Sequence, residues 1–152
     1  MAIAQAMCTQ FKVELLKGTH NFATNGNAFK LALYAEGSGG KNSTTATLGA
    51  TTTAFTTTGE VASSGTYTTG GGTLTKVNSF PKATGTKAIA DFDNISFTTA
   101  TITAMGALIY NSTNANKAVA VLDFTTNKTS TSGTFTIQFP TANTSQAIIR
   151  IA

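Results

Sequence analysis

Threonine constrains the fold of this chain more than any other feature, because it occupies 32 of the 152 positions. Its branched Cβ loses side-chain freedom in a helix and suits the pleated surface of a β-sheet. Its hydroxyl also suits the solvent side of a strand whose other side is buried. Only 11% of the residues are charged, whereas 41% are hydrophobic. The composition therefore predicts an all-β protein whose wet surfaces carry hydroxyl groups in place of charges.

Alternation of apolar and polar residues supports this prediction. Residues 29–34 (FKLALY) alternate, so we expect a strand with one buried face there. The Asn25-Gly26 pair ahead of this strand is a turn signal. Residues 134–139 (TFTIQF) alternate strictly, and Pro140 is expected to end that strand because it cannot donate to a ladder.

Six further strands are predicted from shorter runs. Residues 101–110 and 118–124 are expected to form a hairpin across NSTNANK, whereas residues 11–16 fit either a strand or one turn of helix. The remaining strands are predicted at residues 73–77, 88–92, 95–97 and 146–151. About eight strands in one chain predict a single domain over residues 1–152. Its expected architecture is an antiparallel β-sandwich or a jelly-roll-like fold with long Gly/Thr-rich loops.

Two segments depart from the regular pattern. Residues 35–72 are rich in Gly and Thr and are interpreted as a loop-rich insertion with one short element near residues 51–58. Leu48, Phe55, Val61 and Tyr67 recur in it as side chains that a loop could bury. Residues 1–10 are interpreted as an N-terminal arm that docks on a neighbouring subunit.

Charge and targeting signals exclude several classes of protein. The net charge is +4, but the basic residues are scattered and only Arg150 is an arginine, so no nucleic-acid partner is expected. No apolar run approaches the roughly 20 residues that span a bilayer, so no membrane partner is expected. The start of the chain lacks a basic region and a continuous apolar core, so we expect no signal peptide. Cys8 is the only cysteine, which excludes an intrachain disulfide.

Few residues are candidates for chemistry. His20 is the only histidine, and a catalytic triad or a histidine metal site would need it; the alternative is a local hydrogen bond at a turn beside Phe22. Asp91 and Asp93 would share one side of an extended strand and could bind a cation or act in acid/base catalysis. The alternative for this pair is a strand end or turn, where Asp is common.

Three weaker candidates are given structural interpretations. Glu60 lies in a run, TTTGEV, that fits a turn or the end of a short helix. The glycines at 70–72 lack the strand and helix context of a phosphate-binding loop and predict a flexible turn. Cys8 has no neighbour that would lower its pKa and is interpreted as a small, partly buried apolar residue. We therefore predict no catalytic, cofactor-binding or metal-binding residues and no enzymatic activity.

The order of these segments resembles small virion proteins of tailed bacteriophages. The similarity covers FKVELLKGTHNF, FKLALY, TTAFTTTGEVASSGTYTTGGGTL, ALIYNSTNANKAVAVLDFTTNKTSTSGTFTIQFP and the final AIIRIA. It includes a Glu-Val-x-x-x-Gly-x-Tyr loop, here Glu60, Val61, Gly65 and Tyr67. The resemblance implies a structural protein without a cofactor, made in the host cytoplasm and located in the virion.

The expected function is capsid decoration, or cementing, through contacts with the major capsid protein or other virion proteins and through self-association. Phe55, Tyr67 and Phe80 are the candidate interface residues, with burial under their own loops as the alternative. A tail, neck or fibre component that contacts the host is a second hypothesis. A carbohydrate-binding β-sandwich or a small hydrolase is a third, weakened by the absence of Trp and by the single His.

Overall fold

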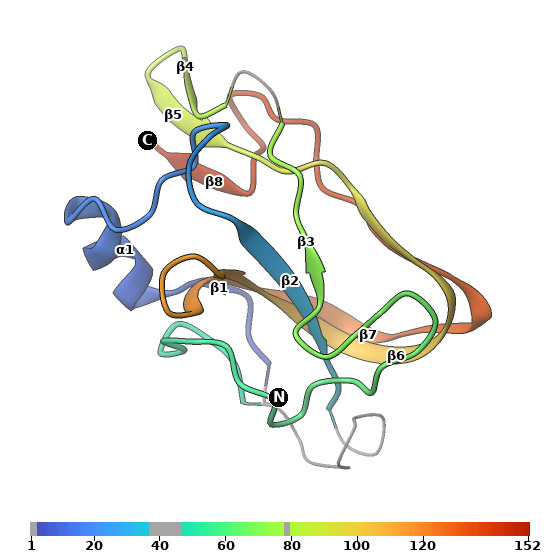
Figure 1. The fold of residues 1–152 in the computed structure, drawn as a ribbon. Coiled ribbons are helices and arrows are strands. Elements are labelled where there is room, and N and C mark those ends of the chain that lie inside the picture. Colours follow the sequence, from blue (N-terminus) through green and yellow to red (C-terminus); the bar gives the residue numbers. More distant parts are fainter. Residues whose placement is uncertain (1–2, 37–46, 78–79) are drawn as a thin grey trace.

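Two antiparallel sheets make up the protein in the computed structural model, which describes residues 3–36, 47–77 and 80–152 (Figure 1). The larger sheet has the strand order β1-β7-β6-β2-β3, and the smaller has the order β4-β5-β8. The predicted all-β, sandwich-like single domain is confirmed. The strands are β1 (Ala6–Met7), β2 (Phe29–Tyr34), β3 (Gly72–Thr73), β4 (Lys82–Thr84), β5 (Lys87–Ala90), β6 (Ile95–Asn111), β7 (Lys117–Ile137) and β8 (Ile149–Ile151), and the helix is α1 (Thr9–Leu16).

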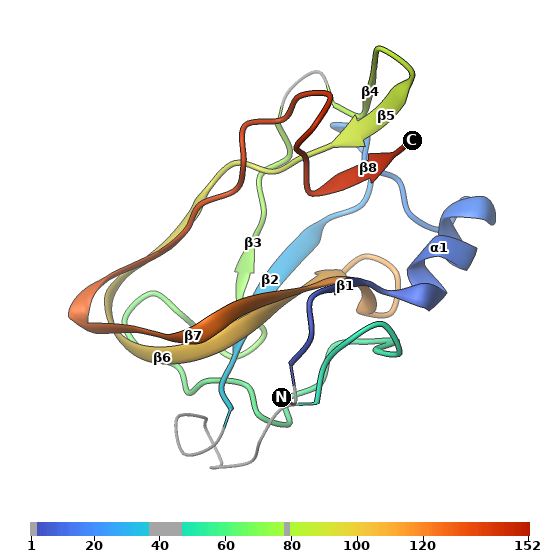
Figure 2. The same cartoon turned by 180° about the vertical axis from the view of Figure 1, so that it is seen from behind.

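The β6–β7 hairpin dominates the molecule. The hairpin predicted across NSTNANK is present, but its strands run from the Asn111–Lys117 pair to the Ile95–Ile137 pair. The segments predicted as separate strands at 95–97 and 134–139 are therefore the far ends of β6 and of β7, which stops at Ile137. Figure 2 shows the hairpin folding back on itself in a V shape.

Irregular pairing explains this bend. The register of β6 against β7 shifts four times, and three of the shifts lie between Phe97 and Gly106. Thr99, Thr125 and Ser132 adopt positive φ near these shifts. Bulges of this kind add a residue to one strand, which bends the strand and increases its twist. Because each bulge is a local backbone event, the alternation of side chains alone did not reveal one continuous strand.

Strand β2 is the centre of the core. The predicted buried face is present, with Phe29, Leu31 and Leu33 at most 1% exposed. Ala32 and Tyr34 on the other face are also 0% exposed, so the expectation of a single buried face is wrong. Strand β3 pairs only with the first half of β2, at Lys30 and Leu31, and the loop at residues 59–67 covers the rest of that edge.

The N-terminal segment belongs to the domain. Strand β1 pairs with β7 through Ala6 and Met7, and Ile3 is fully buried beside Leu48. Residues 3–10, expected as an arm for a neighbouring subunit, therefore pack against their own chain. Residues 9–16 form helix α1, which decides the open alternative at 11–16 in favour of helix. No helix in the described ranges is long and apolar enough to cross a membrane.

The loop-rich prediction for residues 35–72 holds where the chain is described. Residues 47–71 contain no strand, and the expected element at 51–58 is reduced to one bridge between Ala54 and Lys117. Leu48, Val61 and Tyr67 are buried as anchors. Part of the segment, residues 37–46, lies outside the described residues. The strands predicted at 73–77, 88–92 and 146–151 are shorter than expected or shifted, at β3, β5 and β8.

Candidate functional site

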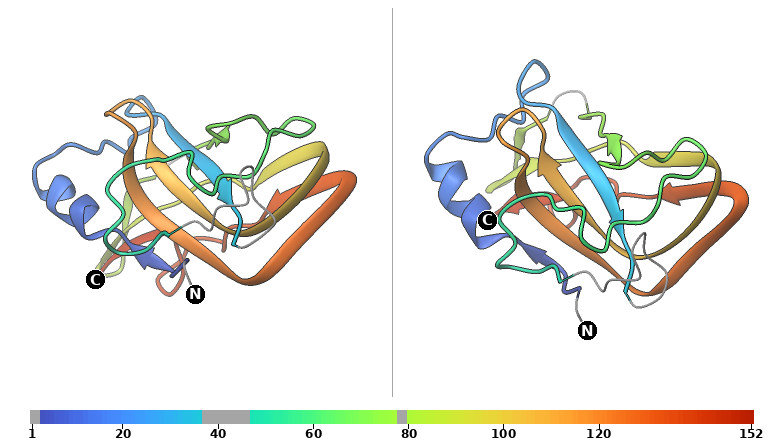
Figure 3. Two further views of the ribbon diagram at one scale, coloured as in Figure 1. Left: turned by 90° about the horizontal axis from the view of Figure 1, so that it is seen from below. Right: turned by 60° about the horizontal axis from the view of Figure 1, so that its bottom comes forward.

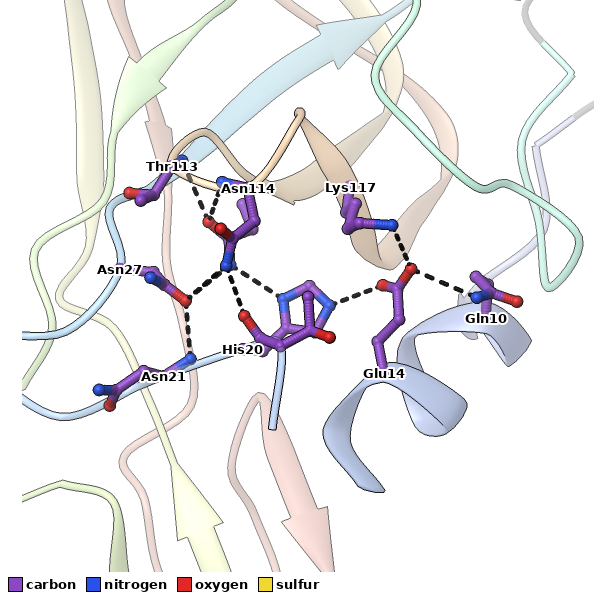
Figure 4. A network of polar contacts seen from close by, with 10 residues as sticks. Gln10, Glu14, His20, Asn21, Asn27, Thr113, Asn114 and Lys117 are labelled. Atoms are coloured by element: carbon purple, nitrogen blue, oxygen red, sulfur yellow. Dashed lines mark hydrogen bonds and ion pairs between the residues drawn. The ribbon is translucent and has the colours of Figure 1, made fainter. Parts of the chain in front are cut away.

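His20 lies at the centre of a buried polar network that we call the His20 cluster (Figure 4). Its Nε2 lies 2.8 Å from Oε2 of Glu14, which is on the inward face of α1. The other carboxylate oxygen of Glu14 accepts hydrogen bonds from Lys117 Nζ at 2.6 Å and Gln10 Nε2 at 3.3 Å. On its other side, His20 Nδ1 lies 3.0 Å from the side-chain amide of Asn111. The cluster thus joins α1 to the closed end of the β6–β7 hairpin.

The hydrogen bonds of Asn111 determine which nitrogen of His20 carries the proton. Oδ1 of Asn111 accepts the backbone N–H groups of Thr113 and Asn114, so Nδ2 is the atom that faces His20. An amide N–H can only donate, so Nδ1 of His20 accepts and Nε2 carries the proton that it donates to Glu14. Both ring nitrogens are therefore engaged inside the chain, and the lone pair of Nδ1 does not face solvent.

Glu14 is the charged centre of this cluster and is 3% exposed. Burial by itself would raise its pKa, but hydrogen bonds from Lys117, His20 and Gln10 outweigh burial and hold the pKa below its ordinary value. The sequence predicted that His20 forms a local hydrogen bond. This prediction is wrong for one of its two partners, since Asn111 lies 91 residues away in the chain. The expected position near Phe22 is correct in that His20 belongs to the same aromatic group. Its ring contacts Phe11 and Phe29, Phe22 stacks on Phe29, and Phe11 meets Phe22 edge-on.

A second buried group, the Glu60 cluster, consists of Glu60 with Tyr34, Tyr67, Gly70 and Tyr110. Oε1 of Glu60 accepts the Tyr67 hydroxyl at 2.9 Å and the Gly70 backbone N–H at 2.6 Å. The Tyr110 hydroxyl donates to the Gly70 carbonyl at 2.6 Å. Burial, with the charge of Glu60, raises the pKa of Tyr110 to about 12 and raises the pKa values of Tyr34 and Tyr67 as well.

The Glu60 cluster gives the Glu-Val-x-x-x-Gly-x-Tyr segment a structural role. Tyr67 accepts the Leu33 N–H and Val61 donates to the Leu33 carbonyl, so the loop replaces β3 along the edge of β2. Gly65 has φ +56, and a Cβ there would overlap the carbonyl oxygens of Thr98 and Thr99 on β6. Glu60 lies at a turn and not at the end of a short helix, which were the two settings predicted from the sequence. The spacing of Glu60, Gly65 and Tyr67 was visible in the sequence, but nothing there indicated mutual contact.

Asp91 and Asp93 line one hollow of about 400 Å³, together with Phe80 and Lys82. Asp91 is 3% exposed and accepts the Phe92 N–H at 2.9 Å, whereas Asp93 is exposed. Burial raises the pKa of Asp91, against the lowering effect of backbone N–H groups at Phe92 and Ile148. In the described parts of the chain no group of three or more His, Cys, Asp or Glu side chains could hold a metal ion.

The three candidate interface residues differ in exposure. Tyr67 is fully buried, so its assignment as a surface contact is wrong, because its hydroxyl is needed inside the Glu60 cluster. Phe55 is half-buried and stacks on Tyr110 with ring centroids 4.8 Å apart. Phe80 is half-buried, and the Lys82 ammonium lies 4.8 Å from its ring centre. Cys8 is 0% exposed, which exceeds the predicted partial burial, and burial raises its pKa to about 11.

A surface feature missed by the sequence analysis lies between α1 and the small sheet. We call it the α1–β8 groove, a hollow of about 370 Å³ whose apolar lining includes Leu15, Phe22, Pro81, Ile89, Ile149 and Ile151. His20 forms part of its wall, so the His20 cluster lies directly behind it. Residues from three distant segments form the groove, and no periodic pattern in any one of them could have indicated it.

Comparison with known protein families, curated proteins and solved structures finds no match to this chain. The two buried clusters, the hydroxyl-rich surface and the groove are the features of the molecule that bear on function. Each of these features follows from contacts within the described residues.

Proposed function

We propose that this chain is a non-enzymatic structural protein of a tailed-bacteriophage virion, and that it decorates or cements the head lattice through contacts with the major capsid protein and with its own copies. One observation carries the proposal. The buried ionisable groups Glu14, His20 and Glu60 are used to fasten a helix and a loop to the central sheet. Such groups supply rigidity, which a lattice protein needs.

The surface supports a scaffold function. Both arms of the bent hairpin expose threonines, among them Thr98, Thr101, Thr126 and Thr129. Hydroxyl groups make weak, short-range hydrogen bonds in water, so they suit broad contacts that many copies repeat. Half-buried Phe55 and Phe80 remain candidate contact residues within this proposal.

The alternatives fit this arrangement less well. The chain has no Trp, and Tyr34, Tyr67 and Tyr110 are its only tyrosines and are at most 3% exposed, which leaves no Trp or Tyr platform for a sugar. A hydrolase with a histidine base would have to use His20, but Asn111 and Glu14 occupy both of its ring nitrogens. A tail, neck or fibre component shares the same structural logic and is the second candidate.

Particle labelling tests the proposal. Antibodies raised against the recombinant protein are applied to purified particles that carry its gene, and bound gold is located by electron microscopy. Many copies spread over the head are expected. Label confined to the tail or fibres would replace the decoration role with the second candidate, and absence of the protein from particles would overturn the proposal.

A further inference from the structure

Helix α1 and the small sheet with its edge strand β8 lie near each other at one end of the molecule (Figures 1 and 3). Residues of both line the α1–β8 groove. The exposed large hydrophobic side chains of the described residues belong to its two borders, α1 and β8. The large hydrophobic side chains exposed there are Leu16 at 92%, Ile151 at 53% and Val13 at 40%. Val13 and Leu16 are three residues apart in α1, so they share its outward face.

Two exposed lysines lie on the α1 side of the groove. Lys12 and Lys17 are the exposed lysines on and just after α1 in the segments that contribute lining residues, which lie within residues 9–22, 81–90 and 149–151. In the same segments Lys82 lies over Phe80, and Lys87 and Arg150 donate to the Thr144 carbonyl. The only acidic residue of these segments is Glu14, which is buried and held by Lys117 and His20. Because that carboxylate faces inward, the exposed charges on the α1 side of the groove are those of Lys12 and Lys17.

We propose that the α1–β8 groove binds a segment of a partner protein that carries bulky apolar side chains flanked by carboxylates. The apolar side chains fill the space between α1 and the small sheet, and the carboxylates meet Lys12 and Lys17 on the helix. A second copy of this chain is a poor occupant, because it brings the same basic residues to the contact and buries three of its six carboxylates.

This inference rests on the proposed function, since it names the chemistry of the virion protein that the chain contacts. Within that function, the groove contacts an acidic, apolar segment of the lattice protein. Electrostatic attraction of this kind is screened by salt, so the contact weakens as ionic strength rises.

A synthetic probe tests the groove directly. A short unstructured peptide with two leucines and several glutamates is titrated into the labelled protein, and amide chemical shifts are followed by NMR. Shifts are expected to concentrate at residues 12–22, 88–90 and 149–151. The same peptide with lysine in place of each glutamate is expected to bind on the order of tenfold more weakly. Equal binding of both peptides, or shifts located elsewhere, would overturn the inference.

Matched variants distinguish the electrostatic contribution to binding from the apolar one. Lys17→Glu reverses a charge beside the groove, whereas Lys128→Glu makes the same change on exposed β7. The first is expected to weaken binding of the glutamate peptide about fivefold and the second to leave it unchanged. Ile151→Ser removes an exposed apolar side chain and is expected to weaken both peptides. All three positions are solvent-accessible, so folding is preserved; equal effects of Lys17→Glu and Lys128→Glu would contradict the proposed electrostatic contact.

Binding to particles separates this inference from the proposed function. Particles made without the gene are incubated with the wild-type protein or with the Lys12→Glu/Lys17→Glu variant and then pelleted. Binding of the wild type alone supports both proposals. Equal binding of both proteins keeps the virion function and overturns the groove contact. Absence of wild-type binding counts against the function, and the peptide titration then decides the groove by itself. Dimerisation that Ile151→Ser abolishes would assign the groove to a second copy instead.

Discussion

Buried carboxylates are the residue-scale feature that organises this protein. An unpaired charge in an apolar interior is very costly, so buried acids survive only with donors around them. Glu14 has a lysine, a histidine and a glutamine side chain, and Glu60 has a tyrosine hydroxyl and a backbone N–H. Each acid therefore holds its surroundings in one arrangement, and removal of a donor is expected to cost more than an average surface change.

Tyr67→Phe tests the Glu60 cluster. It removes the hydroxyl that donates to Glu60 and accepts from the Leu33 N–H, so the free energy of unfolding is expected to fall by about 2–3 kcal/mol. Tyr110→Phe removes one hydroxyl that donates to the partly accessible Gly70 carbonyl and is expected to cost about 1 kcal/mol. Urea denaturation of both variants measures the difference. Equal losses would mean that the Tyr67 hydroxyl is not a key donor.

Acid stability tests Glu14 against Asp91. The pKa of Glu14 is lowered in the folded state, so its stabilising effect is complete above the ordinary value of 4.5 and is lost as pH falls further. The pKa of Asp91 is raised from 3.8, so its ionisation opposes folding as pH rises past that value. Glu14→Gln is therefore expected to reduce the slope with which the free energy of unfolding falls as pH drops below 4.5. Asp91→Asn is expected to increase that slope, because the wild type gains stability when Asp91 becomes protonated. Urea titrations across acid pH measure both slopes, and slopes that change in the same direction would contradict these signs.

At the scale of elements, loops are fitted to strands by close backbone approach. Gly71 has φ +75, and a Cβ at this position would overlap the carbonyl oxygen of Leu31. The loop that leads into β3 can therefore pair with β2 only if position 71 has no side chain. Gly18, just after α1, also has positive φ, at +70, but a Cβ at this position would meet no atom within 4 Å.

The two glycines separate backbone strain from steric overlap. Gly18→Ala is expected to cost roughly 1–2 kcal/mol, the penalty of the left-handed conformation alone. Gly71→Ala adds the overlap with Leu31, so it is expected to cost more than about 3 kcal/mol and to detach β3. Urea denaturation gives the energies, and NMR shifts at Lys30 and Leu31 report the pairing. A similar cost for both variants would show that the loop at Gly71 can move aside.

At the scale of the whole molecule, the two sheets differ in how they are supported. Strands β2, β6 and β7 pair over long ladders, and Leu31, Leu108 and Val119 in them are 0% exposed. The small sheet has three short strands, and each of its ladders contains three residue pairs. Both β4 and β8 are edges of that sheet. Short ladders with open edges open locally at low free energy.

Native-state hydrogen exchange tests this difference. The amides of β2 and of β6 near Leu108 are expected to exchange only through global unfolding. Amides of β5 and β8 are expected to exchange at least about tenfold faster, through local opening of the small sheet. Mass spectrometry of exchanged fragments or NMR measures both regions. Equal protection in the two sheets would show that they unfold as one cooperative unit.

The sequence by itself determined the fold class, because a strand can be recognised from its own residues. The abundance of Thr and the period-two alternation of apolar residues are local properties of this kind. The sequence located β2 and the closed end of the β6–β7 hairpin for the same reason. It could not reveal that β6 and β7 continue through bulges, because a bulge interrupts the alternation that identifies a strand. It also could not bring Glu14, His20 and Asn111 together, or Glu60 and Tyr67, since nothing in a pattern of spacings specifies contact. Only the tertiary structure decided that these polar residues are buried, that the N-terminal residues pack on their own chain and that α1 and β8 border one apolar groove. The physical reason is that burial and electrostatic pairing depend on which segments meet in space.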